Sequence, residues 1–147
     1  MNVEVNVKDR VARPVHDVFG AIVDPSKLSK FFISSGSRTM KAGTTVEWVF
    51  ADVGGRLAVD IIEVEENRKI AFDWTASGTT ARVTIKLEPV DSGTTIVSIN
   101  ESHWPFDREG VDRALRQTAG WTDFLCCMKA YLQHGINLRS GRSKDEH

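Results

Sequence analysis

Alternation of apolar and polar residues predicts a β-strand at the start of the chain, and helical spacing follows it. Within 3–11, valine alternates with polar residues, which is the period of a half-buried strand. After Pro14 the apolar residues of 15–22 recur at intervals of three and four, as on one face of a helix. Pro25 interrupts that pattern, which resumes over 28–32. We therefore predict a strand followed by two short helices.

The middle of the chain contains further alternating segments that predict antiparallel strands. They cover 46–50, 57–64, 70–74, 81–87 and 96–104. Gly54 and Gly55 supply the positive φ angles that a tight hairpin between the first two segments requires. The alternation slips at Ile62, where one extra residue predicts a β-bulge and a bend in the sheet.

A long amphipathic helix is predicted after the last strand. Asp107 is suited to cap its N-terminus and Gly135 to end it. Its apolar stripe keeps helical spacing for about six turns and consists of Val111, Leu115, Trp121, Leu125, Met128 and Leu132. Residues 139–147 contain nothing apolar to bury, so we expect a flexible tail after a single domain of residues 1–138.

Composition and charge narrow the class of protein. With 147 residues, 41% of them hydrophobic and 27% charged, the chain has the composition of one globular domain. Its net charge of -1 offers no broad positive surface, so we expect no nucleic-acid partner. We find no secretory leader and no apolar run long enough to span a bilayer, which predicts a cytoplasmic protein without a membrane partner. The two cysteines, Cys126 and Cys127, are neighbours in the predicted helix and are expected to be reduced.

The order of these elements predicts an α+β fold. A run of antiparallel strands leaves one sheet face to be covered, and the long helix offers one apolar stripe that covers it. A strongly bent sheet around a single helix is not filled everywhere by side chains, and the remaining space at one end is where pockets lie. We therefore predict a largely apolar cavity between the sheet and the C-terminal helix.

Short motifs spread over most of the chain occur in an order known from one protein superfamily. The first are Ala12-Arg13-Pro14, Val18-Phe19 and Val23-Asp24-Pro25-Ser26-Lys27-Leu28. Later ones are Gly54-Gly55, the strand from Lys69 to Trp74, Gly93-Thr94, Glu101-Ser102, and Gly120-Trp121 with Leu125, Met128 and Leu132. Together they resemble the START-like SRPBCC superfamily, and the last motif resembles its AHSA branch, the activator-of-heat-shock-protein-ATPase-like proteins. The resemblance extends from Val3 to about Gly135.

The resemblance implies a helix-grip (START-like) fold, in which a curved antiparallel sheet wraps around the C-terminal helix, and a cavity for a small hydrophobic ligand. Members of the superfamily include binding proteins, polyketide cyclases and aromatases, and a co-chaperone domain. Three alternatives follow: a protein that binds a lipid or another small hydrophobic or amphipathic ligand, a cyclase- or dehydratase-like enzyme, and a module that contacts a chaperone ATPase. We place ligand binding first. Catalysis, and the choice between monomer and homodimer, stay open.

The candidate ligand-binding residues are the large side chains expected to face inward from the sheet and the helix. They are Trp48, Phe72, Trp74, Ile85, Glu101, His103, Trp121, Phe124, Leu125 and Met128. Binding pockets have mostly apolar walls, and indole rings add hydrogen-bond donors to such walls. Plain core packing is the alternative for each apolar residue taken singly.

Glu101 and His103 are the candidates for polar chemistry in the cavity. Strand parity places both on the inward face of the last strand, together with Val97 and Ile99. A carboxylate beside an imidazole would form an acid–base pair suited to enolisation or dehydration. A hydrated strand end is the alternative, because one extra residue in the strand would reverse the parity. We assign no catalytic residue.

The sequence predicts no metal, nucleotide or serine-hydrolase site. It has no Cys/His pairs at zinc spacing, no glycine-rich phosphate loop and no G-x-S-x-G motif. We therefore expect neither a metal nor a cofactor.

Overall fold

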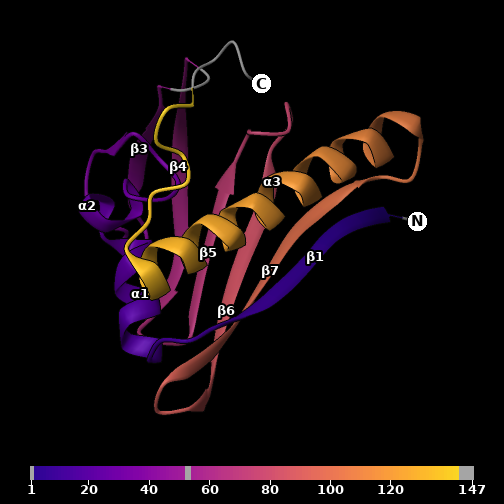
Figure 1. Cartoon of the computed structure of the whole chain (residues 1–147). Helices are drawn as coiled ribbons and strands as arrows, with labels where there is room; N and C mark the ends of the chain where they lie inside the picture. The colour runs from indigo at the N-terminus through magenta and orange to yellow at the C-terminus, as the bar shows by residue number, and fades with distance from the viewer. Residues whose placement is uncertain (1, 52–53, 143–147) are drawn as a thin grey trace.

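One curved antiparallel sheet and a long helix across its concave face make up most of the structure (Figure 1). The computed structural model describes residues 2–51 and 54–142. The strands are β1 (Asn2–Val11), β2 (Ser35–Gly36), β3 (Thr45–Phe50), β4 (Gly55–Glu65), β5 (Lys69–Trp74), β6 (Ala81–Asp91) and β7 (Thr94–Pro105). The helices are α1 (Val15–Val23), α2 (Pro25–Leu28) and α3 (Arg108–His134).

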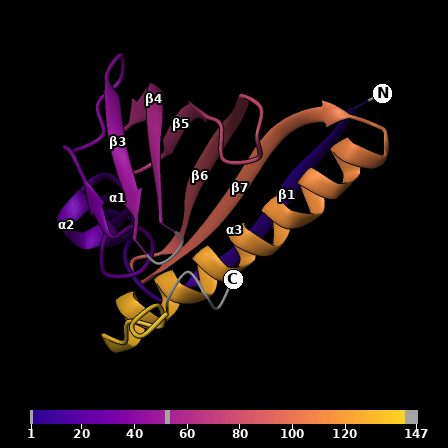
Figure 2. The ribbon, with the colours of Figure 1, turned by 90° about the horizontal axis from the view of Figure 1, so that it is seen from above.

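The strand order of the sheet is β1-β7-β6-β5-β4-β3-β2, so the first strand pairs with the last. The bulge predicted at Ile62 is confirmed: Ile61 pairs with Phe72 and Glu63 with Ala71, which leaves Ile62 unpaired. Seen from above in Figure 2, β1 and β7 run along α3, whereas β3, β4 and β5 stand away from it. The β3–β5 part of the sheet therefore diverges from the helix, while the β1–β7 part stays beside it.

The two short helices form where the sequence predicts them. Asp24 separates them and caps α2, because its side chain accepts a hydrogen bond of 2.9 Å from the backbone N–H of Ser26. Helix α2 ends at Leu28, earlier than the spacing through 28–32 suggests. The two phenylalanines of that segment therefore lie in the turn that follows, where Phe31 is buried and Phe32 is half-buried.

Helix α3 has the predicted caps but a different buried stripe in its first half. Asp107 accepts a hydrogen bond of 2.8 Å from Gly110 N, and Gly135 ends the helix at a φ of 67°. The predicted burial of Leu115 is wrong, since that side chain is 65% exposed. Gly110 and Ala114 are buried instead. Small residues allow the first turns of α3 to lie close to the end of β7, and Leu115 points away from that contact.

Candidate functional site

A cleft of about 500 Å³ opens between α3 and the β3–β5 part of the sheet. Its large apolar lining residues are Phe32, Phe50, Leu57, Trp74 and Trp121, and its polar ones are Arg56, Thr75, Gln117, Asp123, Arg139 and Arg142. Gly120 lies on the α3 side, where its missing side chain leaves open space. The cleft is therefore in the region predicted for the cavity, between the sheet and the C-terminal helix.

A buried carboxylate lies directly behind the cleft wall. Glu101 of β7 is 0% exposed. Its Oε2 accepts a hydrogen bond of 2.9 Å from Trp74 Nε1, and its Oε1 accepts one of 2.8 Å from Trp121 Nε1 and one of 2.9 Å from Gln117 Nε2. All three donors belong to residues that line the cleft. Glu101 thus holds three wall residues at once.

This arrangement compensates the cost of burying Glu101. A charged group removed from water is strongly destabilising unless hydrogen bonds replace its hydration, and a carboxylate can only accept hydrogen bonds. The atoms of the three partners that contact Glu101 are all donors, so each contact pairs a donor with an acceptor. Because Trp74 lies on β5 and Gln117 and Trp121 lie on α3, the carboxylate also ties the sheet to the helix.

The rings of the cleft wall pack against one another and leave little space behind them. Trp74 and Trp121 have ring centroids 5.4 Å apart with an interplanar angle of 32°. Phe32 lies 5.8 Å from Trp121 and 5.2 Å, edge-on, from Phe50. Trp48 continues the cluster into the core through edge contacts with Phe32 and Trp74. Such pairs add stability beyond their buried area, so the wall is rigid.

The predicted site residues divide into a cleft group and a core group. Trp74 and Trp121 line the cleft, and Glu101 lies behind them. The others that face inward are buried and do not line it: Trp48, Phe72, Ile85, Phe124, Leu125 and Met128. The structure therefore brings the two tryptophans and Glu101 together and packs the remaining apolar candidates around the cluster.

The prediction that His103 shares the inward face with Glu101 is wrong. His103 is exposed. On β1, Val3 pairs with Trp104 and Val5 with Glu101, so β7 carries one residue more than β1 between these two pairs. This bulge reverses the parity, which buries Trp104 and turns His103 outward. Glu101 and His103 form no acid–base pair.

Several lining residues were missed by sequence reasoning. Gln117 precedes Trp121 by four residues, one helical turn, so both lie on one face of α3, and this spacing would have identified it. Phe50 has the parity of Trp48 in its strand and could have been found in the same way. Arg139 and Arg142 belong to a stretch without any hydrophobic pattern, and no sequence signal marks them.

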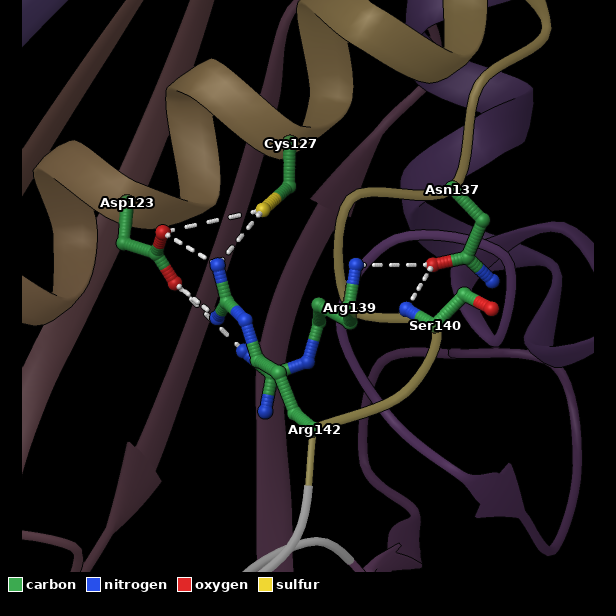
Figure 3. Close-up of polar contacts among 6 residues, drawn as sticks. All are labelled: Asp123, Cys127, Asn137, Arg139, Ser140 and Arg142. Atoms are coloured by element: carbon green, nitrogen blue, oxygen red, sulfur yellow. Dashed lines mark hydrogen bonds and ion pairs between the residues drawn. The ribbon is translucent and has the colours of Figure 1, made fainter. Parts of the chain in front are cut away.

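After Gly135 the chain leaves the end of α3 and forms a loop beside the helix, and we call residues 136–142 the C-terminal segment (Figures 1 and 3). Asn137 Oδ1 accepts hydrogen bonds from the backbone N–H groups of Arg139 and Ser140, at 2.9 and 3.1 Å. This turn returns Arg142 to Asp123 on α3. Of the tail predicted to be flexible, Arg139 and Arg142 therefore contact α3, and 143–147 lie outside the described residues.

Two guanidinium groups of the C-terminal segment contact the carboxylate of Asp123 (Figure 3). Arg142 binds it in a two-pronged contact, with Nη1–Oδ2 at 2.8 Å and Nη2–Oδ1 at 3.1 Å, and Arg139 Nη1 lies 3.5 Å from Oδ2. The hydrogen bond from Arg142 lowers the pKa of Asp123 against the opposing effect of burial, and the charges of both arginines add to it. The side chain of Asp123 is 39% exposed, so water screens part of its attraction to the two arginines.

Cys127 lies next to this ion pair. Its Sγ donates a weak hydrogen bond of 3.7 Å to Asp123 Oδ1 and lies 4.0 Å from Arg142 Nη2. Burial raises the pKa of Cys127, and the negative charge of Asp123 raises it further. The group is therefore a thiol at neutral pH, whereas its neighbour Cys126 is exposed.

We expect the two cysteines to react at very different rates. Iodoacetamide alkylates the thiolate, so the exposed Cys126 should be modified about tenfold or more faster than the buried Cys127, whose raised pKa leaves less thiolate. Mass spectrometry of the native protein should show a single label that maps to Cys126. Equal labelling of both residues before unfolding would contradict the packing of Cys127 against Asp123.

Two further features are absent from the described residues. They contain no group of three or more His, Cys, Asp or Glu side chains that could hold a metal ion. Across 2–51 and 54–142, no helix is both long and apolar enough to cross a membrane.

Comparison with known proteins identifies relatives over nearly the whole chain. Residues 12–133 match the family described as Activator of Hsp90 ATPase homolog 1-like protein. The chain is similar to the solved structure of protein SSP2350 from Staphylococcus saprophyticus, with a TM-score of 0.82 and 34% identity over 95% of this chain and 98% of that one. No curated protein matches it.

Two more distant structures share the fold alone. The Aha1 dimer from Colwellia psychrerythraea has a TM-score of 0.78 and 20% identity over 90% of this chain and 98% of that one. DynU16, a protein of the dynemicin biosynthetic locus, has a TM-score of 0.80 and 24% identity over 91% of this chain, which spans 48% of DynU16.

The architecture and the comparisons agree. The predicted helix-grip fold is confirmed by the curved antiparallel sheet, the long C-terminal helix and the similarity to SSP2350. The matched segment contains Trp74, Glu101, Gln117 and Trp121. Since that match spans residues 12–133, the chain belongs to the Activator of Hsp90 ATPase homolog 1-like family of the START-like SRPBCC superfamily.

Proposed function

We propose that the protein binds a small hydrophobic or amphipathic molecule in the cleft between α3 and β3–β5. The observation that carries the proposal is the pair of indole rings, Trp74 and Trp121, which line the cleft while the buried Glu101 holds their N–H groups. Rings that are already fixed lose little conformational freedom when a ligand packs on them, which favours binding.

The size and lining of the cleft support this proposal. Its volume of about 500 Å³ lies within the range of small-molecule sites, roughly 300–1,000 Å³. Aromatic rings form most of its large apolar wall, and a few polar groups at the edge are available to orient a ligand. A cleft with these properties suits a planar or chain-like apolar body with one polar end.

The two other functions expected from the resemblance have less support. We do not propose a cyclase or dehydratase that uses Glu101 with His103, because the two side chains lie in different environments. Family membership favours a chaperone contact as a second candidate, and one structural neighbour is described as an Aha1 dimer. A chaperone partner, the choice between monomer and homodimer, and a cytoplasmic location stay predictions for this chain.

A cleft-filling substitution tests the ligand proposal. N-phenylnaphthylamine is a neutral apolar dye whose emission rises in an apolar site, and it should also quench tryptophan emission when it lies against Trp74 and Trp121. Gly120→Leu places a side chain in the open space of the cleft and should weaken dye binding about tenfold or more. Leucine also favours the helix over glycine, so the melting temperature should stay the same or rise.

Ala119→Leu is the matched control. Ala119 is the exposed neighbour of Gly120 on α3 and does not line the cleft, so this variant should bind the dye as the unmodified protein does. Absence of dye binding to the unmodified protein, or equal binding by Gly120→Leu, would refute the cleft as the ligand site.

A further inference from the structure

One long edge of the sheet is open. β1 has ten residues, lies outermost on its side and pairs with β7 alone (Figure 1). No strand in the described parts of the chain pairs with the other side of β1. The opposite edge of the sheet ends in β2, which has only two residues. A long edge strand presents a row of unpaired backbone N–H and C=O groups, to which another strand can pair.

The backbone of β1 shows which residues face this open edge. In antiparallel strands, alternate residues direct their N–H and C=O groups to opposite sides. The carbonyl of Val5 accepts a hydrogen bond of 3.2 Å from Asn100 Nδ2 of the neighbouring β7. The N–H of Arg10 donates instead to the adjacent side chain, Asp9 Oδ1, at 2.8 Å. The backbone groups of the even-numbered residues from Glu4 to Arg10 therefore face the open edge.

The exposed side chains of β1 match a second copy of the same strand. Glu4 and Lys8 are both exposed and lie on either side of Asn6. When two copies of β1 pair antiparallel about a two-fold axis at Asn6, Glu4 of each copy lies opposite Lys8 of the other, and Asn2 lies opposite Arg10. Opposite charges that face each other across antiparallel strands stabilise the pairing. Within one chain, Glu4 and Lys8 are about 13 Å apart along the strand, too far for an ion pair.

The inner face of β1 fits the same register. Val3 and Val7 pack against the core but are only half-buried. In the paired strands Val7 lies opposite Val5 of the second copy, so pairing removes apolar surface from water. An inward charge can prevent an edge strand from pairing, and Asp9 is such a residue. Its carboxylate is already bound by Lys129 of α3 at 3.2 Å, however, which reduces this obstacle.

We propose that two copies of this chain associate through their β1 strands, antiparallel about Asn6, into one continuous sheet. The contact is isologous, so the pairing of Glu4 with Lys8 occurs twice in each dimer. These charges favour a second copy over an uncharged strand, which could form the same backbone hydrogen bonds but not the charge pairs. The cleft lies between α3 and β3–β5, away from β1 in the strand order, so the inference does not depend on the proposed function.

Charge-reversal variants test this register. Sedimentation equilibrium of the unmodified protein should show monomers and dimers in exchange. Glu4→Lys places like charges opposite each other at both symmetric contacts and should weaken the dimer about tenfold or more, and Lys8→Glu should do the same. Glu4→Lys/Lys8→Glu restores opposite charges and should dimerise within about threefold of the unmodified protein. Lys86→Glu makes the same change at an exposed position of the interior strand β6 and should leave the dimer intact.

Disulfide formation tests the position of the two-fold axis. The background is Cys126→Ser, which removes the exposed thiol. Asn6→Cys then places two thiols opposite each other, with Cα atoms about 5.5 Å apart, a distance that a disulfide spans. Mild oxidation should link this variant into covalent dimers. Arg10→Cys lies on the same edge and is equally exposed, but it faces Asn2 of the second copy and should stay unlinked.

Three results would overturn the proposal. The first is a protein that stays monomeric up to about 1 mM. The second is a dimer whose stability is the same in the unmodified protein, in Glu4→Lys and in Lys8→Glu. The third is a dimer in which Arg10→Cys links as readily as Asn6→Cys, because such a dimer uses another surface or another register. None of these results bears on dye binding in the cleft.

Discussion

Replacing Glu101 with glutamine is expected to destabilise the folded protein by about 2 to 4 kcal/mol. Glutamine has the shape of glutamate but carries one acceptor oxygen and an NH₂ group. Its oxygen can still accept from Trp121 and Gln117, whereas its nitrogen would face the N–H of Trp74. A buried donor is then left without an acceptor, and the charge that strengthens the other two hydrogen bonds is lost.

A double-mutant cycle tests this explanation. Glu101→Gln and Trp74→Phe each remove the same hydrogen bond, so the double variant should lose less stability than the sum of the single losses, by about 1 to 2 kcal/mol. Urea unfolding followed by far-ultraviolet circular dichroism measures all four proteins without dependence on tryptophan emission. Strictly additive losses would show that the contact between Trp74 and Glu101 does not carry the effect.

The control for the glutamate substitution lies on the surface. Glu66 is exposed in the turn between β4 and β5, and Glu66→Gln should change stability by less than about 0.5 kcal/mol.

Glu101→Gln should also weaken binding of N-phenylnaphthylamine at temperatures where the variant stays folded, because Trp74 and Trp121 lose their fixed positions in the wall. Unchanged dye affinity would mean that Glu101 supports the fold but does not prepare the cleft.

The two β-bulges show how far the sequence predicts the fold. The bulge at Ile62 follows from the sequence, because apolar residues on both sides reveal the change of parity. At the second bulge the two residues between Glu101 and Trp104 are polar, and Trp104 is the one apolar residue of β7 that follows with the new parity, so the change of parity is hard to recognise in the sequence. The position of this bulge depends on the pairing of β7 with β1, which joins the first strand of the sequence to the last. The sequence therefore predicts Glu101 inside but places His103 incorrectly.

The hydrogen-bond partners of Glu101 could not be predicted from local sequence patterns either. Trp74 is 27 residues from Glu101 and Trp121 is 20 residues from it, on different elements. Their meeting depends on the position of α3 across the sheet, which no period in the sequence encodes. The sequence does indicate that Glu101 needs hydrogen-bond donors, because a carboxylate on the inward face of a strand is costly to bury without them. The C-terminal segment gives no comparable signal in the sequence. In the part of it that the structure describes, Arg139 and Arg142 are held by hydrogen bonds and ion pairs and not by burial of apolar side chains.

Gly110→Ala is the second change with a large expected effect, a loss of about 3 kcal/mol or failure to fold. Gly110 is buried in the first turn of α3, and an added Cβ would overlap the carbonyl oxygen of Pro105 and lie 3.2 Å from Trp104 Cβ. Backbone atoms at the end of β7 cannot yield as a flexible side chain would. The helix would have to move away from the strand.

Gly120→Ala is the matched control, because it makes the same chemical change in the same helix where nothing lies within 4 Å of the added Cβ. It should stabilise the protein by up to about 1 kcal/mol, since alanine favours the helix. Urea unfolding of both variants should therefore shift in opposite directions, and equal shifts would contradict close contact between α3 and β7.

The contact between α3 and β7 matters for the cleft because the first turn of α3 sets the position of Gln117 and Trp121 farther along the same rigid helix. A displaced helix would carry both donors away from Glu101, so Gly110→Ala should also weaken dye binding in whatever fraction remains folded.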